Sequence, residues 1–345
     1  MRQSSSVAVL AALLVISGCS REASSPEPDG RDPSSAGSPA QPSTSEPATS
    51  EPATPEPATS ESPAPETESE VEVVEPIGPD DLDLRPALDA VRHLAGVIGP
   101  RQATSRAYDR AASWVGDRLD RLGYSVRRQR VDVPAGTSWG VPVAAGRSVN
   151  VIAWPPGFAP GQPHLVVGAH LDTVAGAPGA EDNASGVGVM LAAAQAAAIR
   201  RTRLPVVFVA FGAEEPRGPT DADHHYGSRQ YVARLSPRQR DSLRGMVSLD
   251  RVGVGGAVPV GSATETDPVQ EALLAAARRL RVPAVADPDQ RSSDHWSFVR
   301  AGLPAARLGS TPYAGYHSPR DVPAVVRPAQ LGRVGRIVLE WLAPR

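Results

Sequence analysis

The feature that most constrains the fold is a set of short, apolar segments separated by helical patterns. "HLVVGAH" at 164–170 and "LPVVFVAFGA" at 204–213 contain almost no polar residue, as expected of strands buried on both faces of a sheet. Between them, "ASGVGVMLAAAQAAAI" at 184–199 has the length and composition of a helix. This alternation predicts an α/β fold: a three-layer α/β/α sandwich around a central, mostly parallel mixed sheet.

Further helices and strands are expected on both sides of these segments. Apolar residues recur at three- and four-residue spacing, the period of an amphipathic helix, in 84–122, 226–235, 267–281 and 328–343. Shorter stretches that read as strands are 124–133, 148–154, 243–253 and 303–309. Together these segments predict one folded domain over 81–345, long enough to bury a sizeable core.

Residues 20–80 have a composition that argues against a packed core. Pro, Ala, Ser, Thr and Glu recur in "SEPATSEPATPEPATSESPAPE", with hardly any apolar side chain. Such a segment cannot bury enough surface to offset its ordering entropy, so we expect a disordered linker. Residues 21–80 hold 14 acidic residues and two arginines, which leaves a net charge of +8 on 81–345. Because the basic residues there form no cluster, we expect no nucleic-acid partner.

The first 19 residues read as an export signal. Arg2 precedes the apolar run "VAVLAALLVI", which is too short to cross a bilayer. The following "ISGC" resembles a bacterial lipobox, in which Cys19 becomes the lipidated first residue of the mature protein. Cys19 is the only cysteine, so a disulfide within the chain is excluded. We expect a lipoprotein signal peptide over 1–19 and a protein anchored by this lipid to the outer face of the cell membrane; a secreted protein with an ordinary signal peptide is the alternative.

Polar residues stand where several predicted strands end, which is where reactive groups gather in parallel sheets. Imidazole nitrogens and carboxylate oxygens are ligands that zinc accepts, and two histidines with three or more carboxylates exceed the needs of one ion. The set therefore indicates two metal ions that share a bridging carboxylate around a common water molecule. The segments are "GAHLDT" with His170 and Asp172, "GAEDNASG" with Asp182, "FGAEEP" with Glu214 and Glu215, "SLDRVG" with Asp250, and "YHSPRD" with His317 and Asp321.

The order H-x-D, (D/E)-D-N-x-S-G, E-E, D and Y-H resembles the di-zinc aminopeptidases of the aminopeptidase S and aminopeptidase Y type. The resemblance runs from about residue 145 to 320, and the motifs are specific as a set although each is short. It implies a zinc-exopeptidase-like α/β fold, two Zn²⁺ ions per chain, peptide substrates, and removal of their N-terminal residues.

Carried over residue by residue, the resemblance implies five metal ligands. His170 and Asp250 would hold one zinc ion, and Glu215 and His317 would hold the other. Asp182 would bridge the two ions.

The resemblance also implies residues that support the ligands. Asp172 would accept the free ring N–H of His170 and so fix its orientation. Asp321 is expected to serve His317 in the same way. Asn183 follows the bridging aspartate, at a position where the family has a cis peptide bond.

Glu214 and Glu215 are adjacent but are expected to have different tasks. Consecutive side chains of an extended backbone point in opposite directions, so Glu215 can bind a metal ion while Glu214 faces the water between the ions. Glu214 would then be the general base, which takes the proton of that water and passes it to the leaving amine. Tyr316 matches a tyrosine that stabilises the oxyanion in some family members; an aromatic side chain packed beside the site is an equal alternative.

The segment after Glu215 departs from the family pattern. "PRGPTDADHHYGSRQYV" is longer and more polar than the usual link. We expect His224 and His225 to lie in a wet loop rather than to line the substrate cleft.

Glutaminyl cyclases, relatives with one catalytic zinc ion, are also compatible with this longer link and with "SSDHWSFVRAGLPA", where Asp294, His295 and Trp296 are candidates to line the pocket. The cyclases usually have two acidic residues before that histidine and a tryptophan before the last metal ligand. Here Ser293 stands before Asp294, and Tyr316 replaces the tryptophan, which favours the peptidase.

Other functions stay open. A catalytically inactive, lipid-anchored binding module would be expected to lack a ligand or the base, yet each expected position is filled. Carboxypeptidase or aminoacylase-like hydrolysis is possible, because the metal centre activates water whichever end of the substrate is held. We expect a monomer, although no sequence feature determines the oligomeric state.

Overall fold

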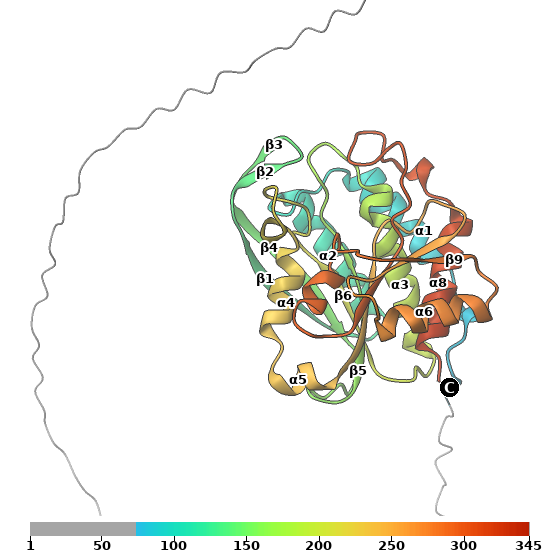
Figure 1. Cartoon of the computed structure of the whole chain (residues 1–345). Coiled ribbons are helices and arrows are strands. Elements are labelled where there is room, and N and C mark those ends of the chain that lie inside the picture. The colour runs from blue at the N-terminus through green and yellow to red at the C-terminus, as the bar shows by residue number, and fades with distance from the viewer. Residues whose placement is uncertain (1–73, 345) are drawn as a thin grey trace, which may run out of the picture. The chain divides into compact units, whose positions relative to one another are not determined.

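A computed structural model describes residues 74–344; the predicted signal peptide with Cys19, and the linker up to residue 73, lie outside the described residues. A mixed sheet of eight strands forms the centre, in the order β1-β4-β6-β5-β7-β10-β8-β9 (Figure 1). In chain order the strands are β1 Ser125–Val133, β4 Gly146–Trp154, β5 His164–His170, β6 Val206–Phe211, β7 Leu243–Leu249, β8 Val258–Gly261, β9 Ala284–Asp287 and β10 Ala305–Leu308.

The central strands β6, β5, β7 and β10 are parallel neighbours. Antiparallel pairs join β1 to β4, β4 to β6, and β10 to β8, whereas β9 is parallel to β8. Every residue of β5 and of β6 is buried, which explains why β6 and the interior of β5 are apolar. The prediction of a mixed, mostly parallel sheet is confirmed.

Helices cover both faces of the sheet (Figure 1). Val167 and Phe208 belong to a large apolar cluster with α1, α2, α3, α6 and α8, whereas Val166 and Val209 belong to a second cluster with α4 and α7. Successive side chains of a strand point to opposite faces, so the two clusters define a helix layer on each side, as predicted. The helices are α1 Arg85–Val91, α2 Arg106–Arg121, α3 Gly186–Ile199, α4 Tyr226–Arg234, α5 Pro237–Ser242, α6 Pro268–Arg279, α7 His295–Val299 and α8 Pro328–Leu342.

Several short elements are not predicted by the sequence pattern. The helix expected from residue 84 begins as α1 and continues as a π-helix, η2 Arg92–Ile98. A hairpin of β2 Gly136–Ser138 and β3 Val141–Val143 stands outside the main sheet. Segments of three or four residues are too short for a period to be visible. Among the described residues, no helix has the length and apolar character needed to cross a membrane.

The packed chain begins before residue 81, where the sequence places the end of the linker. Ile77 is 2% exposed, and its N–H donates to the carbonyl of Arg201, which is also bridged to Pro76. Burial of this one apolar side chain offsets part of the ordering cost of its neighbours. Residues 74–80 are therefore part of the packed structure.

Candidate metal centre

The candidate ligands converge at one edge of the sheet. His170 ends β5, Asp250 directly follows β7, and Glu214 and Glu215 follow β6 after a link of Gly-Ala. Because these three strands are parallel neighbours, their carboxyl ends meet at the same edge. His317 reaches this edge from the loop after β10.

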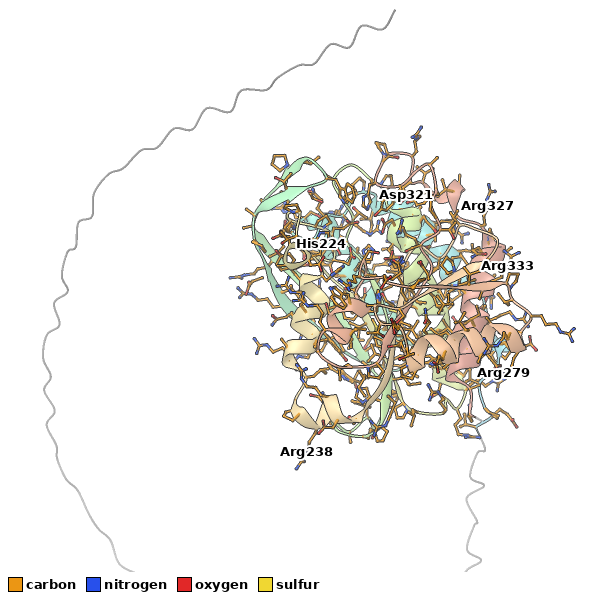
Figure 2. All side chains as sticks on the ribbon, in the orientation of Figure 1. His224, Arg238, Arg279, Asp321, Arg327 and Arg333 are labelled. Atoms are coloured by element: carbon orange, nitrogen blue, oxygen red, sulfur yellow. The ribbon has the colours of Figure 1, made fainter. Side chains whose placement is uncertain are left out.

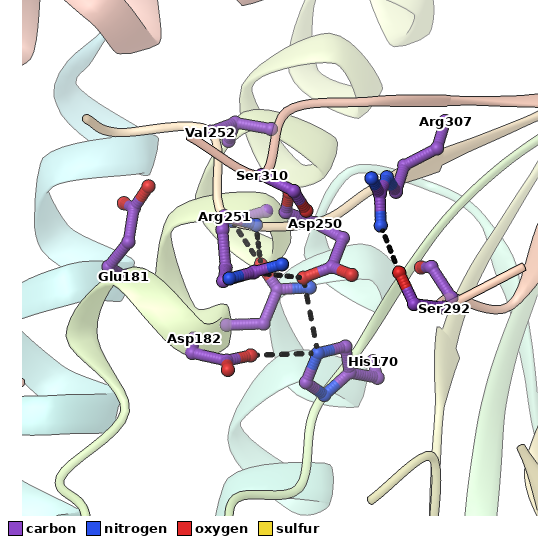
Figure 3. Close-up of polar contacts among 12 residues, drawn as sticks. His170, Glu181, Asp182, Asp250, Arg251, Val252, Ser292, Arg307 and Ser310 are labelled. Carbon is purple, nitrogen blue, oxygen red and sulfur yellow. Dashed lines mark hydrogen bonds and ion pairs between the residues drawn. The ribbon is translucent and has the colours of Figure 1, made fainter. Parts of the chain in front are cut away.

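Asp182 lies between the two histidines. Its Oδ1 is 3.1 Å from Nε2 of His170, and its Oδ2 is 3.0 Å from Nε2 of His317. A second carboxylate accompanies each ring: Oδ1 of Asp250 is 3.6 Å from Nε2 of His170, and Oε2 of Glu215 is 3.7 Å from Nε2 of His317. Figure 3 shows the His170 half of this arrangement. All five predicted ligands are thus brought together, with Asp182 between two pairs.

The donor set fits metal ions. Ligand atoms of His170, Asp182 and Glu215 lie within 4.8 Å of one another, as do those of His170, Glu214 and Asp250, which makes two buried, overlapping candidate sites. Oδ1 of Asp250 is buried and accepts no hydrogen bond from the described residues. Carboxylates buried this close together repel one another unless cations compensate their charge. Imidazole and carboxylate donors without a thiolate suit zinc.

Asp172 acts differently from its predicted role. Its carboxylate accepts hydrogen bonds from the backbone N–H groups of Glu214 at 3.0 Å and Glu215 at 3.2 Å. Nδ1 of His170 lies 3.2 Å from the backbone carbonyl of Asp172 but 3.9 Å from its carboxylate. The carbonyl therefore orients the imidazole. The carboxylate instead fixes the two glutamates, because β5 and β6 end side by side.

Asp321 likewise holds backbone rather than the ring of His317. Its Oδ1 accepts from the N–H of Glu181 at 2.8 Å, and its Oδ2 accepts from the N–H of Asp182 at 3.1 Å. Nδ1 of His317 has no hydrogen-bond partner among the described residues. The prediction that Asp321 orients His317 is therefore wrong, and Asp321 holds the backbone at Asp182 instead.

The segment around Asp182 is tied to the end of β7. The peptide bond between Asp182 and Asn183 is cis, as the resemblance implies. The side chain of Asn183 donates to the carbonyl of Leu249 at 2.8 Å and accepts from the N–H of Arg251 at 3.2 Å. These bonds connect the bridging aspartate to the backbone on either side of Asp250.

Glu181 is a positioning residue that the sequence motifs did not predict. Its carboxylate accepts from the N–H groups of Gly253 at 2.8 Å and Val254 at 3.0 Å, in the loop that follows β7. Burial raises the pKa of Glu181 to about 8. An acidic residue next to Asp182 within the otherwise small-residue segment "GAEDNASG" is the signal that could have drawn attention to it.

Burial and neighbouring charges shift the pKa values of these groups in different directions. Burial acts to raise the pKa of Asp182, but hydrogen bonds from His170 and His317 outweigh it and leave that pKa below its ordinary value. Burial, reinforced by Asp182 and Glu214, raises the pKa of Glu215 well above its ordinary value. Burial also raises the pKa of Glu214 to about 7, although His170 opposes the shift. A carboxyl group that titrates near neutrality can accept a proton and release it again.

A cavity of about 440 Å³ opens over the candidate ligands. Trp139, in the turn between β2 and β3, places its ring centroid 4.5 Å from that of His317, and Tyr316 stacks on His317 at 3.6 Å. Other walls come from the loops at 216–225 and 289–292. The sequence did not predict the place of Trp139 in the cavity wall, because a short hairpin pattern does not indicate where its turn lies relative to the rest of the fold.

His225 is buried, which contradicts the prediction of a wet loop. It is 4% exposed, and its Nε2 is 3.1 Å from Oε1 of Glu214. The N–H of His225 donates to the carbonyl of Glu214 at 2.9 Å, so the loop folds back over the strand end. His224 also lines the cavity. Figure 2 shows His224 and Asp321 toward the same end of the molecule, far from Arg238 of α5.

Asp294, His295 and Trp296 do not line this cavity. Asp294 and His295 are fully buried, and the residues just before them, 289–292, face the cavity instead.

The family follows from comparison with known proteins. The family model described as "Peptidase family M28" matches residues 150–342, which is more than half of the chain. The chain belongs to peptidase family M28. All five candidate ligands and Glu214 fall within the matched part.

Two curated relatives show how far the similarity of this family member extends. Aminopeptidase YwaD of Bacillus subtilis (strain 168) is 30% identical over 185 residues, which cover 50% of this chain and 39% of the relative. Leupeptin-inactivating enzyme 1 of Streptomyces exfoliatus is 27% identical over 240 residues, which cover 67% of this chain and 50% of the relative. The chain thus spans half or less of the length of these relatives.

Solved structures share the fold of this chain. A zinc aminopeptidase from Bacillus subtilis matches with a TM-score of 0.68 and 18% identity over 76% of this chain and 96% of that one. A glutaminyl cyclase from Porphyromonas gingivalis matches with a TM-score of 0.66 and 21% identity over 76% of this chain and 98% of that one. The predicted zinc-exopeptidase-like fold is confirmed, and both enzyme classes use it.

Proposed function

We propose that the protein is an aminopeptidase that removes N-terminal residues from peptides with two zinc ions. The observation that carries this proposal is Asp182, which offers one oxygen to each histidine while each histidine has a further carboxylate beside it. That geometry fits His170 and Asp250 on one ion, Glu215 and His317 on the other, and Asp182 on both. Membership of family M28 supports the same activity.

The residues around this centre account for the proton transfers. Bound zinc ions would lower the pKa of a water molecule between them and polarise the scissile carbonyl. Glu214 takes the proton of the attacking water and delivers it to the leaving amine. Asp172 holds the backbone of Glu214, and His225 contacts its carboxylate, so the base is fixed from two sides. Tyr316, which lines the cavity and stacks on His317, is placed to donate to the oxyanion.

A glutaminyl-peptide cyclotransferase with a single zinc ion is the second candidate. Solved glutaminyl cyclases share the fold with TM-scores of 0.66 and 0.65. Tyr316 in place of a tryptophan, and Ser293 in place of an acidic residue, favour the peptidase. An inactive binding module has less support, because the predicted ligands and Glu214 all reach the same edge.

We also propose that the protein is exported, anchored by a lipid on Cys19 to the outer face of the cell membrane, and acts there as a monomer on peptides. This proposal is supported by the sequence of 1–19 and by the acidic composition of 20–80. Cys19→Ala should move the protein from the membrane fraction to the soluble one. An unchanged distribution would contradict the anchor.

The activity can be tested on the purified chain after its metal content has been counted. A mixture of short peptides, some with N-terminal glutamine, is incubated with and without a chelator, and the products are read by mass spectrometry. Loss of single N-terminal residues that the chelator abolishes and zinc restores is expected. Loss of ammonia from the glutamine peptides alone would identify a cyclase, and trimming from the other end a carboxypeptidase. Peptides left intact by zinc-loaded protein would overturn all three.

A further inference from the structure

Arg251, directly after the candidate ligand Asp250, has a constrained backbone. Its φ is 55°, in the left-handed region that long side chains rarely adopt. The N–H of Arg251 donates to the side chain of Asn183 at 3.2 Å, and its carbonyl accepts from the N–H of Ser310 at 2.9 Å. This backbone conformation costs free energy, yet hydrogen bonds on both sides of the residue maintain it. Such a conformation indicates that the direction of the Arg251 side chain matters for function.

The guanidinium of Arg251 lines the cavity without a hydrogen-bond acceptor among the described residues. Its side chain is 14% exposed, and its Cζ lies 4.4 Å from the centre of the Tyr316 ring. Nε forms a long ion pair with Oδ1 of Asp250 at 3.8 Å (Figure 3), a distance too great for a hydrogen bond. Within the described part of the chain the guanidinium donates no hydrogen bond to another residue, although it has five N–H donors.

Two other buried arginines of the same region show how a structural arginine is paired. Arg101 donates to backbone carbonyls of the 171–179 loop at 2.6, 2.7 and 3.0 Å. Arg307 donates to side chains of the 289–292 loop at 2.7 and 2.8 Å. In both, terminal guanidinium nitrogens donate to protein acceptors, whereas the guanidinium of Arg251 has no such acceptor among the described residues and lines the cavity.

The charges that surround the cavity indicate whether Arg251 is needed to neutralise the buried carboxylates. Four carboxylates belong to the two candidate metal sites: Asp182, Glu214, Glu215 and Asp250. Two divalent ions would match their full negative charge, so the positive charge of Arg251 would not be needed for neutrality. The other charged residues that line the cavity, at its rim, are exposed and screened by water. A largely buried cation, held only by a long ion pair with Asp250 and by the ring of Tyr316, would therefore remain beside the candidate metal centre.

We propose that Arg251, stacked on Tyr316, binds a carboxylate of the substrate, and that the enzyme prefers peptides with a negative charge next to the scissile bond. This rests on the proposed aminopeptidase function. The carboxylate can come from an acidic N-terminal side chain or from the C-terminus of a dipeptide, since both lie within one residue of that bond. A guanidinium can pair with either through two parallel N–H donors, which strengthens the contact where water is excluded.

Matched peptides separate the two sources. The zinc-loaded full chain is assayed on aspartyl-leucine amide against asparaginyl-leucine amide, and on leucyl-alanine against leucyl-alanine amide. The wild type should prefer the charged member of at least one pair. Arg251→Met should lower kcat/KM for that member about 10- to 100-fold, mainly through KM, and change the neutral member less than about threefold. Arg251→Lys should give an intermediate kcat/KM for the charged member, because it keeps the positive charge but loses the two parallel N–H donors.

Arg291→Met is the matched control, since Arg291 is an exposed arginine that lines the same cavity. It should leave the preference unchanged. Equal losses on charged and neutral peptides in Arg251→Met, or loss of zinc by elemental analysis, would show a structural role and overturn the proposal.

A binding measurement keeps the proposal independent of turnover. Calorimetry on the zinc-loaded chain compares free aspartate with free asparagine. Tighter binding of aspartate, with the difference absent in Arg251→Met, supports the carboxylate site even if no peptide is cleaved. Equal binding of the two amino acids, together with no preference for a dipeptide over its amide, overturns it.

Discussion

The two sides of the cavity are built differently. The ligand side consists of mostly buried side chains at or beside the ends of parallel strands, and backbone hydrogen bonds to Asp172 and Asp321 hold part of it in place. The opposite side consists of the β2–β3 hairpin and loops such as 216–225. Trp139 on that side is 60% exposed, whereas His170 on the ligand side is 1% exposed. The contrast indicates that the sheet and the segments tied to it position the candidate ligands, while the surrounding loops form most of the remaining cavity wall.

The largest effect is expected at Glu214, where the two sides meet. Glu214→Gln keeps the shape of the side chain but cannot take a proton, so kcat should fall about 10²- to 10⁴-fold. Zinc content should stay near that of the wild type, because Glu215 and the other proposed ligands are intact. Steady-state kinetics and elemental analysis on the same sample check both points. Activity close to wild type would remove Glu214 as the base.

Removal of a proposed ligand should lower the metal content of the protein. Glu215→Gln and His317→Ala each take a donor from the same proposed ion, so metal content should fall from about two ions per chain to about one. His224→Ala is the control, because His224 lines the cavity but is not one of the five proposed ligands. Full occupancy in Glu215→Gln or His317→Ala would reject the assignment.

The two supporting aspartates, Asp172 and Asp321, are expected to affect different properties of the ligand side. Asp172→Asn and Asp321→Asn each replace one of two acceptor oxygens by an amide group that faces a backbone N–H, and each should cost about 10- to 100-fold in metal affinity or activity. Asp172→Asn should act mainly on kcat, because it loosens Glu214. Asp321→Asn should act mainly on metal affinity, because it loosens Asp182. Metal titrations and steady-state kinetics on each variant measure the metal affinity and kcat separately. Wild-type metal affinity and kcat in both variants would mean that these contacts do not position the site.

The smallest effect is expected on the opposite side of the cavity. Trp139→Ala removes an exposed aromatic wall, so KM should rise about three- to tenfold while kcat and zinc content hold. Val141→Ala, a change at another exposed position of the hairpin, serves as the control. A loss confined to kcat would show that Trp139 shapes the metal centre through His317, and would weaken the contrast between the two sides.

The order of the motifs was sufficient to predict which side chains gather at this edge, because the ends of the parallel strands β5, β6 and β7 converge whatever the connections between them. The same reasoning predicted the helix layers from the apolar runs of β5 and β6. It failed for Asp172 and Asp321, because the atom that a supporting carboxylate binds depends on the path of the neighbouring loop. Those paths are set by three-dimensional packing and leave no period in the sequence.

The substrate side was the least predictable part. His225 looked like a residue of a polar loop, but it is buried because that loop folds back onto Glu214. Trp139 reaches His317 from a hairpin whose position depends on its contact with the loop after Glu215, where the N–H of Thr137 donates to the carbonyl of Arg217 at 3.0 Å. Such contacts join segments that are distant in the chain and cannot be read from either one alone.

The most direct test of the central claim is anomalous diffraction from crystals of the zinc-loaded protein. We expect two zinc peaks on opposite sides of the Asp182 carboxylate, one beside His170 and Asp250 and the other beside Glu215 and His317. A single peak, or a second peak away from Glu215 and His317, would contradict the bridged pair and favour the single-zinc chemistry of the cyclases.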